Sequence, residues 1–154
     1  KKLDDNPAAQ ALRGIIHLRY GALKEAKKAF KGAFALDQTN LVATVYSAAL
    51  ALKEEAPDRA LKTIKPIFTI TPDSVTAWLI VAMAHLDKDK LDKAEEAFLK
   101  AKEYGPTCAS AEIGLAQVAQ KQKDLTKVRA HLKKALALDG ADIRIFQLLK
   151  EIGD

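Results

Sequence analysis

The chain of 154 residues has one cysteine, few aromatic residues and no long run of uncharged apolar residues. The single cysteine, Cys108, excludes a disulfide within the chain and a metal site built from several cysteines, and it is typical of a reducing compartment. The longest runs without charged residues, 38–52 and 74–86, are shorter than the roughly 20 apolar residues that span a bilayer. We therefore expect no transmembrane segment.

The N-terminal residues KKLDDNP have no apolar stretch behind their lysines, so we expect no signal peptide. This favours a cytoplasmic protein. A periplasmic or envelope-associated location is the alternative if a leader was removed, because the sequence does not begin with Met. The balance of 49% hydrophobic and 29% charged residues is that of a globular chain, and the length predicts a single domain, 1–154.

The sequence repeats with a period of 34 residues. Residues 22–37 read ALKEAKKAFKGAFALD and residues 90–105, two periods later, read KLDKAEEAFLKAKEYG, with Leu, Ala, Ala, Phe and Ala at the same places. The aligned columns hold small residues at Ala26, Ala60, Ala94 and Val128, and large ones at Phe30, Ile64, Phe98 and Leu132. No insertion or deletion separates the units. Such self-similarity predicts repeats at 7–40, 41–74, 75–108 and 109–142.

Each unit has the apolar spacing of two helices, with steps of three or four residues as in Leu23, Ala26, Phe30 and Ala33. The predicted helices are 7–20, 22–36, 41–54, 57–70, 74–87, 91–104, 108–121, 125–138 and 142–152, and we predict no strand. Capping side chains are expected at Asp5-Asn6, Thr39-Asn40, Asp73-Ser74 and Thr107. Pro66 lies inside the fourth helix, where we expect a kink and not a break.

A 34-residue unit of two helices with small residues at their crossing, an aromatic residue four positions on and a closing proline resembles the tetratricopeptide repeat (TPR) family. The third unit is the best match, with Trp78, Ala94, Phe98, Ala101 and Pro106 in the motif positions. The resemblance implies an all-α fold: a right-handed superhelix of four helix-turn-helix repeats plus the terminal helix 142–152. It also implies a concave groove lined by the first helix of each unit and a convex back formed by the second helices.

If the ligand-facing columns of the family carry over, the groove of this chain is apolar. The candidate partner-binding residues are Leu12, Ile15, Val45, Tyr46, Ala49, Leu79, Ile80, Met83 and Ile113. The Lys, Asn and Arg residues with which some co-chaperones of the family hold a C-terminal carboxylate are missing from these columns. The resemblance therefore disfavours binding of acidic chaperone tails, and unit four makes one end of the groove polar.

No pattern of catalytic, cofactor-binding or metal-ligating residues is present. His17 and His85 lie in equivalent columns two repeats apart, so they are expected to pack or hydrogen-bond and not to share a metal ion. The stretch DKDKLDKAEEAF, 87–98, begins like a calcium loop but lacks its central Gly and its final Glu. Cys108 has no patterned His beside it, and the glycines form no phosphate loop. We expect no enzyme, no cofactor and no metal.

Positive charge is concentrated in the first unit, which has six basic and two acidic residues and therefore a net charge of +4. Without interleaved aromatic residues these lysines do not indicate nucleic-acid binding, and an acidic protein surface is the better match. The sequence thus favours a non-enzymatic protein-protein interaction module that binds an apolar or amphipathic segment of a protein or peptide partner in its groove. The alternative is a structural role, in self-assembly as a homo-oligomer or in a longer repeat scaffold.

Overall fold

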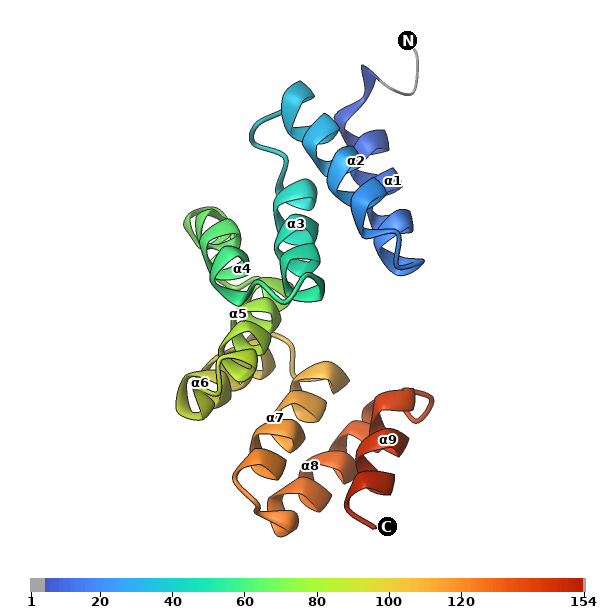
Figure 1. The fold of residues 1–154 in the computed structure, drawn as a ribbon. Coiled ribbons are helices and arrows are strands. Elements are labelled where there is room, and N and C mark those ends of the chain that lie inside the picture. Colours follow the sequence, from blue (N-terminus) through green and yellow to red (C-terminus); the bar gives the residue numbers. More distant parts are fainter. Residues whose placement is uncertain (1–4, 154) are drawn as a thin grey trace. The chain divides into compact units, whose positions relative to one another are not determined.

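The computed structural model describes residues 5–153, and in this range the chain forms nine α-helices, one 3₁₀-helix and no strand (Figure 1). The all-α prediction is confirmed. The elements are α1 (Pro7–Arg19), α2 (Leu23–Leu36), α3 (Leu41–Lys53), α4 (Pro57–Ile64), the 3₁₀-helix η2 (Lys65–Thr69), α5 (Val75–Asp87), α6 (Leu91–Tyr104), α7 (Ala109–Lys121), α8 (Leu125–Leu138) and α9 (Ile143–Glu151).

The helices keep the 34-residue period of the sequence. The first helices of successive units begin 34 residues apart, at Pro7, Leu41, Val75, Ala109 and Ile143. The second helices do the same, at Leu23, Pro57, Leu91 and Leu125. We therefore number repeat positions from the first residue of each first helix, so that Pro7, Leu41, Val75, Ala109 and Ile143 are position 1. By this register α9 is the first helix of a fifth unit.

The residue before each first helix is its N-cap, and most of these caps satisfy free backbone N–H groups. The Oδ1 atoms of Asn6 and Asn40 accept from Ala8 N at 2.9 Å and from Ala43 N at 2.8 Å, and Ser74 and Asp142 cap α5 and α9 in the same way. The prediction of Thr107 as a cap is wrong. Cys108 holds the N-cap position of α7 and makes no side-chain cap hydrogen bond.

The turn inside each unit also repeats, because position 15 has a positive φ in all four units. The residues are Gly21 (φ 73°), Glu55 (53°), Asp89 (55°) and Lys123 (63°). A left-handed residue directly after a helix lets the chain reverse, and glycine adopts this conformation with the least strain. Only the first unit has glycine there, so the other three turns are held in this shape by the packing of their helices.

The second helix of unit two differs from its prediction. α4 ends at Ile64 and continues as the 3₁₀-helix Lys65–Thr69, so the prediction of one kinked α-helix to residue 70 is wrong for its last turn. Pro66 has no N–H to donate to the carbonyl of Lys62, and it lies in the first turn of the 3₁₀-helix, where the N–H groups need no partner within the helix.

The chain divides into two compact units, Lys1–Pro72 and Asp73–Asp154. The core of the first contains Ala11, Ala26, Phe30, Ala33, Ala43 and Leu50. The second has one cluster around Phe98 and another around Leu132. Alanines in these clusters let helices approach closely, and the large side chains fill the layer between hairpins, as the aligned columns predict. The prediction of a single domain, 1–154, stays a prediction.

Within each compact unit, a first helix packs on the second helix before it through one face, which we call the junction face: repeat positions 3, 6, 7 and 10. In α3 this face brings Ala43, Tyr46 and Leu50 into the cluster of Phe30. In α7 it brings Leu115 and Val118 into the cluster of Phe98. In α9 it brings Ile145, Leu148, Leu149 and Ile152 into the cluster of Leu132. The same four positions therefore form three separate interfaces.

Candidate interaction surface

The predicted groove residues of the first compact unit differ in how much surface they offer. Ile15 on α1 and Tyr46 on α3 are partly buried against the core of the unit. Val45 and Ala49 on α3 are half-buried. Leu12 on α1 is 58% exposed. Leu12 is at position 6 and so lies on the junction face of α1, and no described helix precedes α1 to cover that face.

In the second compact unit the predicted residues separate into core and surface. Ile80 and Ile113 are buried, so their side chains leave almost no surface for a partner. Leu79 is partly buried against the cluster of Phe98, whereas Met83 is 44% exposed. The role of these residues in binding stays a prediction, and Met83 is the member of the set in this unit with substantial accessible surface.

The junction face of α1 is largely uncovered. At positions 6 and 10 the side chains of Leu12 and Ile16 are exposed at 58% and 47%, and Tyr20 at position 14 is exposed at 87%. On α3 the residue at position 14, Glu54, instead reaches the preceding hairpin, with its Oε1 3.4 Å from Lys27 Nζ. Sequence reasoning missed Ile16 and Tyr20, although the alignment places Ile16 in one column with buried Leu50 and Tyr20 in another with Glu54.

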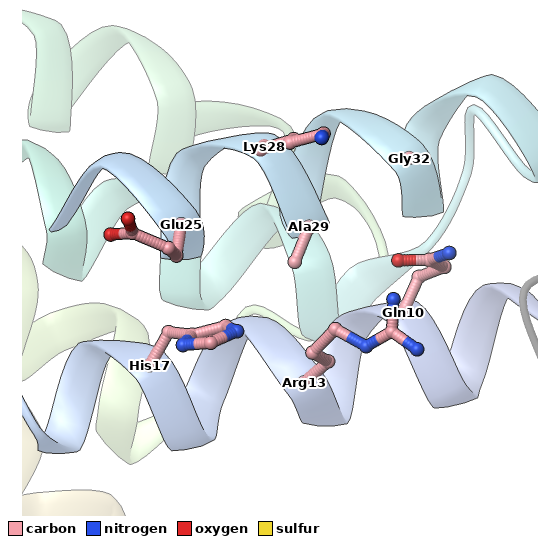
Figure 2. A pocket seen from close by; sticks show the side chains of 7 residues that line it. All are labelled: Gln10, Arg13, His17, Glu25, Lys28, Ala29 and Gly32. Carbon is pink, nitrogen blue, oxygen red and sulfur yellow. The ribbon is translucent and has the colours of Figure 1, made fainter. Parts of the chain in front are cut away.

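A cleft of about 490 Å³ lies between α1 and α2, and five of its seven lining residues are polar or charged. Figure 2 shows Gln10 and Arg13 at the end of the cleft near Gly32, with His17 and Glu25 at the other end. Lys28 and Ala29 complete the lining. Arg13 and Lys28 are cationic and Glu25 is the one acidic residue of the seven, so the lining carries a net positive charge.

The second compact unit contains a buried ionic cluster in which a carboxylate links α6, α7 and α8. Glu112 is only 3% exposed; its Oε1 lies 2.7 Å from Lys102 Nζ and its Oε2 2.7 Å from His131 Nδ1. Burial alone raises the pKa of Glu112, but the hydrogen bonds from Lys102 and His131 outweigh it, so the pKa lies below its usual value. The carboxylate is therefore held ionised as part of the packing between units three and four.

His85 on α5 has a buried Nδ1 without a hydrogen-bond partner among the described residues. Burial lowers the pKa of His85, and the neighbouring lysines Lys93, Lys90 and Lys88 lower it further. Residues 5–153 contain no group of three or more His, Cys, Asp or Glu side chains arranged to hold a metal ion. In the same part of the chain, no helix has the length and apolar character needed to cross a bilayer.

Comparison with known proteins connects this geometry to one family. Residues 75–108, the third unit, match the family model described as tetratricopeptide repeat. Among curated proteins, none has a sequence that matches this chain.

Solved structures give the same answer for the fold. The chain is similar to TTC0263, a thermophilic TPR protein of Thermus thermophilus, with a TM-score of 0.87 and 20% identity over 96% of this chain and 83% of that one. It is also similar to MamA from Desulfovibrio magneticus, with a TM-score of 0.73 and 20% identity over 90% and 78% of the two chains. YrrB, a TPR protein described as having an unusual peptide-binding site, gives 0.71 and 20% over 95% and 75%. Residues 75–108 are therefore a tetratricopeptide repeat, and the chain has the all-α fold of tetratricopeptide repeat proteins.

Proposed function

We propose that the chain is a protein-protein interaction module that binds an apolar or amphipathic segment of a partner through the groove columns of its first helices. The observation that carries the proposal is the exposure of large apolar side chains in these columns. Met83 on α5, 44% exposed, belongs to the predicted columns of the second compact unit, and Val42 on α3, 49% exposed, lies three residues before Val45 and so on the same helix face in the first. Neither side chain contributes to a buried cluster of its unit, so a partner can remove both from water at little cost to the fold.

The chemistry of the columns indicates the kind of segment that fits. Apolar side chains contribute through area removed from water, about 25 cal/mol per Å², and offer few directed hydrogen bonds. An amphipathic helix that presents apolar residues at i, i+3, i+4 and i+7 matches such a lining. YrrB, which shares the fold and is described as having a peptide-binding site, is consistent with this use of the fold.

The test is selection of helical peptides from a display library with the full chain as bait, followed by binding measurements with two variants. Val42→Glu combined with Met83→Glu places charges in the groove columns and is expected to weaken binding at least about tenfold. Leu99→Glu is the matched control, because Leu99 is an exposed apolar residue, 49% accessible, on the second helix α6. If the double variant binds the selected peptides as wild type does, the groove columns are not the binding surface.

Self-assembly is the second candidate, and the end of α9 favours it. Ile143 and Phe146 are exposed at 68% and 52% on α9, and exposed apolar patches tend to mark contacts. Sedimentation of the wild-type chain and of Phe146→Glu over a range of concentrations tests this candidate. A monomer at all concentrations contradicts it.

We also propose that the module is non-enzymatic. The one charged residue that is buried within 5–153, Glu112, is held by Lys102 and His131 in an ionic cluster between helices. A catalytic carboxylate must reach a substrate, and this one is almost inaccessible.

A further inference from the structure

A small pocket lies in the first compact unit, where the second helices α2 and α4 meet the first helix α3. Its volume is about 170 Å³. Phe30 and Phe34 on α2 and Leu50 on α3 supply its apolar walls; Phe30 and Leu50 are buried in the core, and Phe34 is half-buried. We call this site the α2–α4 pocket. All three helices have described helices before and after them in the chain, so the pocket is not at an end of the array.

Small residues at two repeat positions explain the open space. Ser47, at position 7, and Thr63, at position 23, both line the α2–α4 pocket and are half-buried. In the second compact unit the same two positions hold larger side chains. Leu115 is 3% exposed in the cluster of Phe98, and His131 reaches across to a carboxylate on α7. Leucine and histidine thus occupy, between α6, α7 and α8, the space that serine and threonine leave open between α2, α3 and α4.

The charged residues of the α2–α4 pocket are mostly cationic. They are Lys27 and Lys31 on α2, Arg59 on α4 and the carboxylate of Glu54. Glu54 pairs with both Lys27, whose Nζ lies 3.4 Å from its Oε1, and Arg59. Lys31 is exposed and takes no part in these two ion pairs. Three cations and one carboxylate give a net charge of +2, and a negatively charged ligand can pair with Lys31 while the Glu54 pairs stay intact.

The size of the pocket indicates what it can enclose. Pockets that hold drug-sized molecules have volumes of roughly 300–1,000 Å³. The α2–α4 pocket, at about 170 Å³, is smaller and suits a single large apolar side chain. Protein interfaces use such pockets for one anchoring side chain, with polar and charged groups around it. Apolar walls and a cationic rim together favour an apolar anchor with acidic neighbours.

We propose that the α2–α4 pocket is a second binding site, which takes one large apolar side chain from an acidic segment of a partner protein. The anchoring side chain lies against Phe34 and the buried edge of the core, and an acidic residue beside it pairs with Lys31. The site is lined by two second helices, so it is distinct from the groove columns of Val42 and Met83 and does not rest on the function proposed for them.

The probe is a synthetic peptide, acetylated and amidated, with one phenylalanine between two runs of three glutamates. One control peptide has alanine in place of the phenylalanine, and a second has glutamine in place of every glutamate. Each is titrated into the isotope-labelled full chain and followed by the NMR shifts of backbone amides, at low and at physiological salt. We expect the probe to bind at least about tenfold more tightly than either control, with shifts at Phe34 and Thr63. The advantage over the glutamine peptide should shrink as salt rises.

Two protein variants locate the site through independent features. Ser47→Leu fills the pocket with the residue that α7 has at the same position, and is expected to weaken binding of the probe at least about tenfold. Lys31→Glu reverses the charge of an exposed rim residue and is expected to weaken binding at least about fivefold. Lys28→Glu is the matched control, because Lys28 is exposed on the same helix but lines the cleft of Figure 2 instead. Circular dichroism of each variant should remain that of wild type.

The groove variant Val42→Glu/Met83→Glu is expected to bind the probe as wild type does, so failure of the groove proposal gives a different result. The pocket proposal is overturned if the probe does not bind, if the alanine peptide binds as tightly, or if Ser47→Leu leaves binding unchanged. Equal losses in Lys31→Glu and Lys28→Glu overturn it too, because binding then follows the overall charge of α2. Phenylacetate that binds as tightly as the probe identifies a small-molecule site instead. A wild-type dimer that Ser47→Leu dissociates identifies a second copy as the occupant, which also overturns the proposal.

Discussion

Replacing Gly114 by Ala adds one methyl group where α7 packs against the ring of Phe98 in the second compact unit. A Cβ built on Gly114 lies 2.1, 2.2 and 2.6 Å from the Cε1, Cζ and Cδ1 atoms of the Phe98 ring. Carbon atoms do not approach within about 3 Å, so the ring or α7 must move by roughly 1 Å. Both residues are buried, and Phe98 is 1% exposed, so the surrounding side chains resist that movement.

Two effects of opposite sign determine the result. Alanine is favoured over glycine inside a helix by about 1 kcal/mol, and overpacking of a well-packed core costs about 1–3 kcal/mol. Three atoms of a buried ring lie within 3 Å, which places the overpacking near the upper end of its range. We therefore expect Gly114→Ala to lower the free energy of unfolding by about 1–2 kcal/mol.

Gly32→Ala in α2 is the matched control, because there the helix preference acts almost alone. The nearest atoms to its added Cβ belong to the flexible side chain of Gln10, at 3.3 Å. This variant is expected to raise the free energy of unfolding by about 0.5–1 kcal/mol. The same substitution is thus expected to change the free energy of unfolding in opposite directions at two helical glycines.

The assay is urea unfolding followed by circular dichroism, with Phe98→Leu added in a double-mutant cycle. The smaller side chain should relieve the crowding, so Gly114→Ala is expected to cost less in the Phe98→Leu background than in wild type. If Gly114→Ala stabilises the chain as much as Gly32→Ala does, Phe98 does not pack against α7 in solution and the packing argument is refuted.

Four further substitutions test the capping of α7, the turn at repeat position 15 and the buried Glu112. Cys108→Asn should raise the free energy of unfolding by about 0.5–1.5 kcal/mol, because Cys108 has backbone angles close to those of the N-caps Asn40 and Ser74 but makes no cap hydrogen bond. An unchanged urea titration would contradict the capping argument. Lys123→Gly should raise the free energy of unfolding by up to about 1 kcal/mol, because it relieves a φ of 63°. Gly21→Ala should lower it by about 1 kcal/mol, although the added Cβ has open space around it. Equal effects of the two substitutions would rule out backbone strain at position 15. Glu112→Gln should cost about 1–3 kcal/mol at pH 7. The pKa of Glu112 is lowered in the fold, so the stabilisation from its carboxylate is present above the ordinary glutamate pKa of about 4.3 and is lost as the pH falls below that value. The free energy of unfolding of the variant, measured from pH 6 to 3, should therefore fall less steeply than that of wild type.

The sequence predicted the hairpins well because each boundary is specified by local chemistry. Pro57 opens α4, and Asn6, Asn40 and Ser74 cap their helices as their side chains allow. The miss at Cys108 has the same origin: Thr107 is the better capping residue, but the register of the repeat places the helix start after Cys108. Packing between units overrode the local preference there.

Burial was harder to predict than helix position. The family columns assign Ile80 and Ile113 to a ligand-facing surface, yet both are buried. The Lys102–Glu112–His131 cluster was not predicted either, because its members come from three helices and no spacing in the sequence joins them. A column shows which residues share a place in the repeat but does not show how large the neighbouring side chains are.

Position in the array decides exposure where residue type does not. Leu12 and Leu148 are the same residue at the same repeat position, 6, on the first helices α1 and α9. Leu12 is 58% exposed and Leu148 is 5% exposed, because α8 precedes α9 and covers it, whereas no described helix precedes α1. The apolar character that the repeat requires inside the chain is thus retained on the outer side of its first hairpin, with Arg13 and Lys28 added beside it.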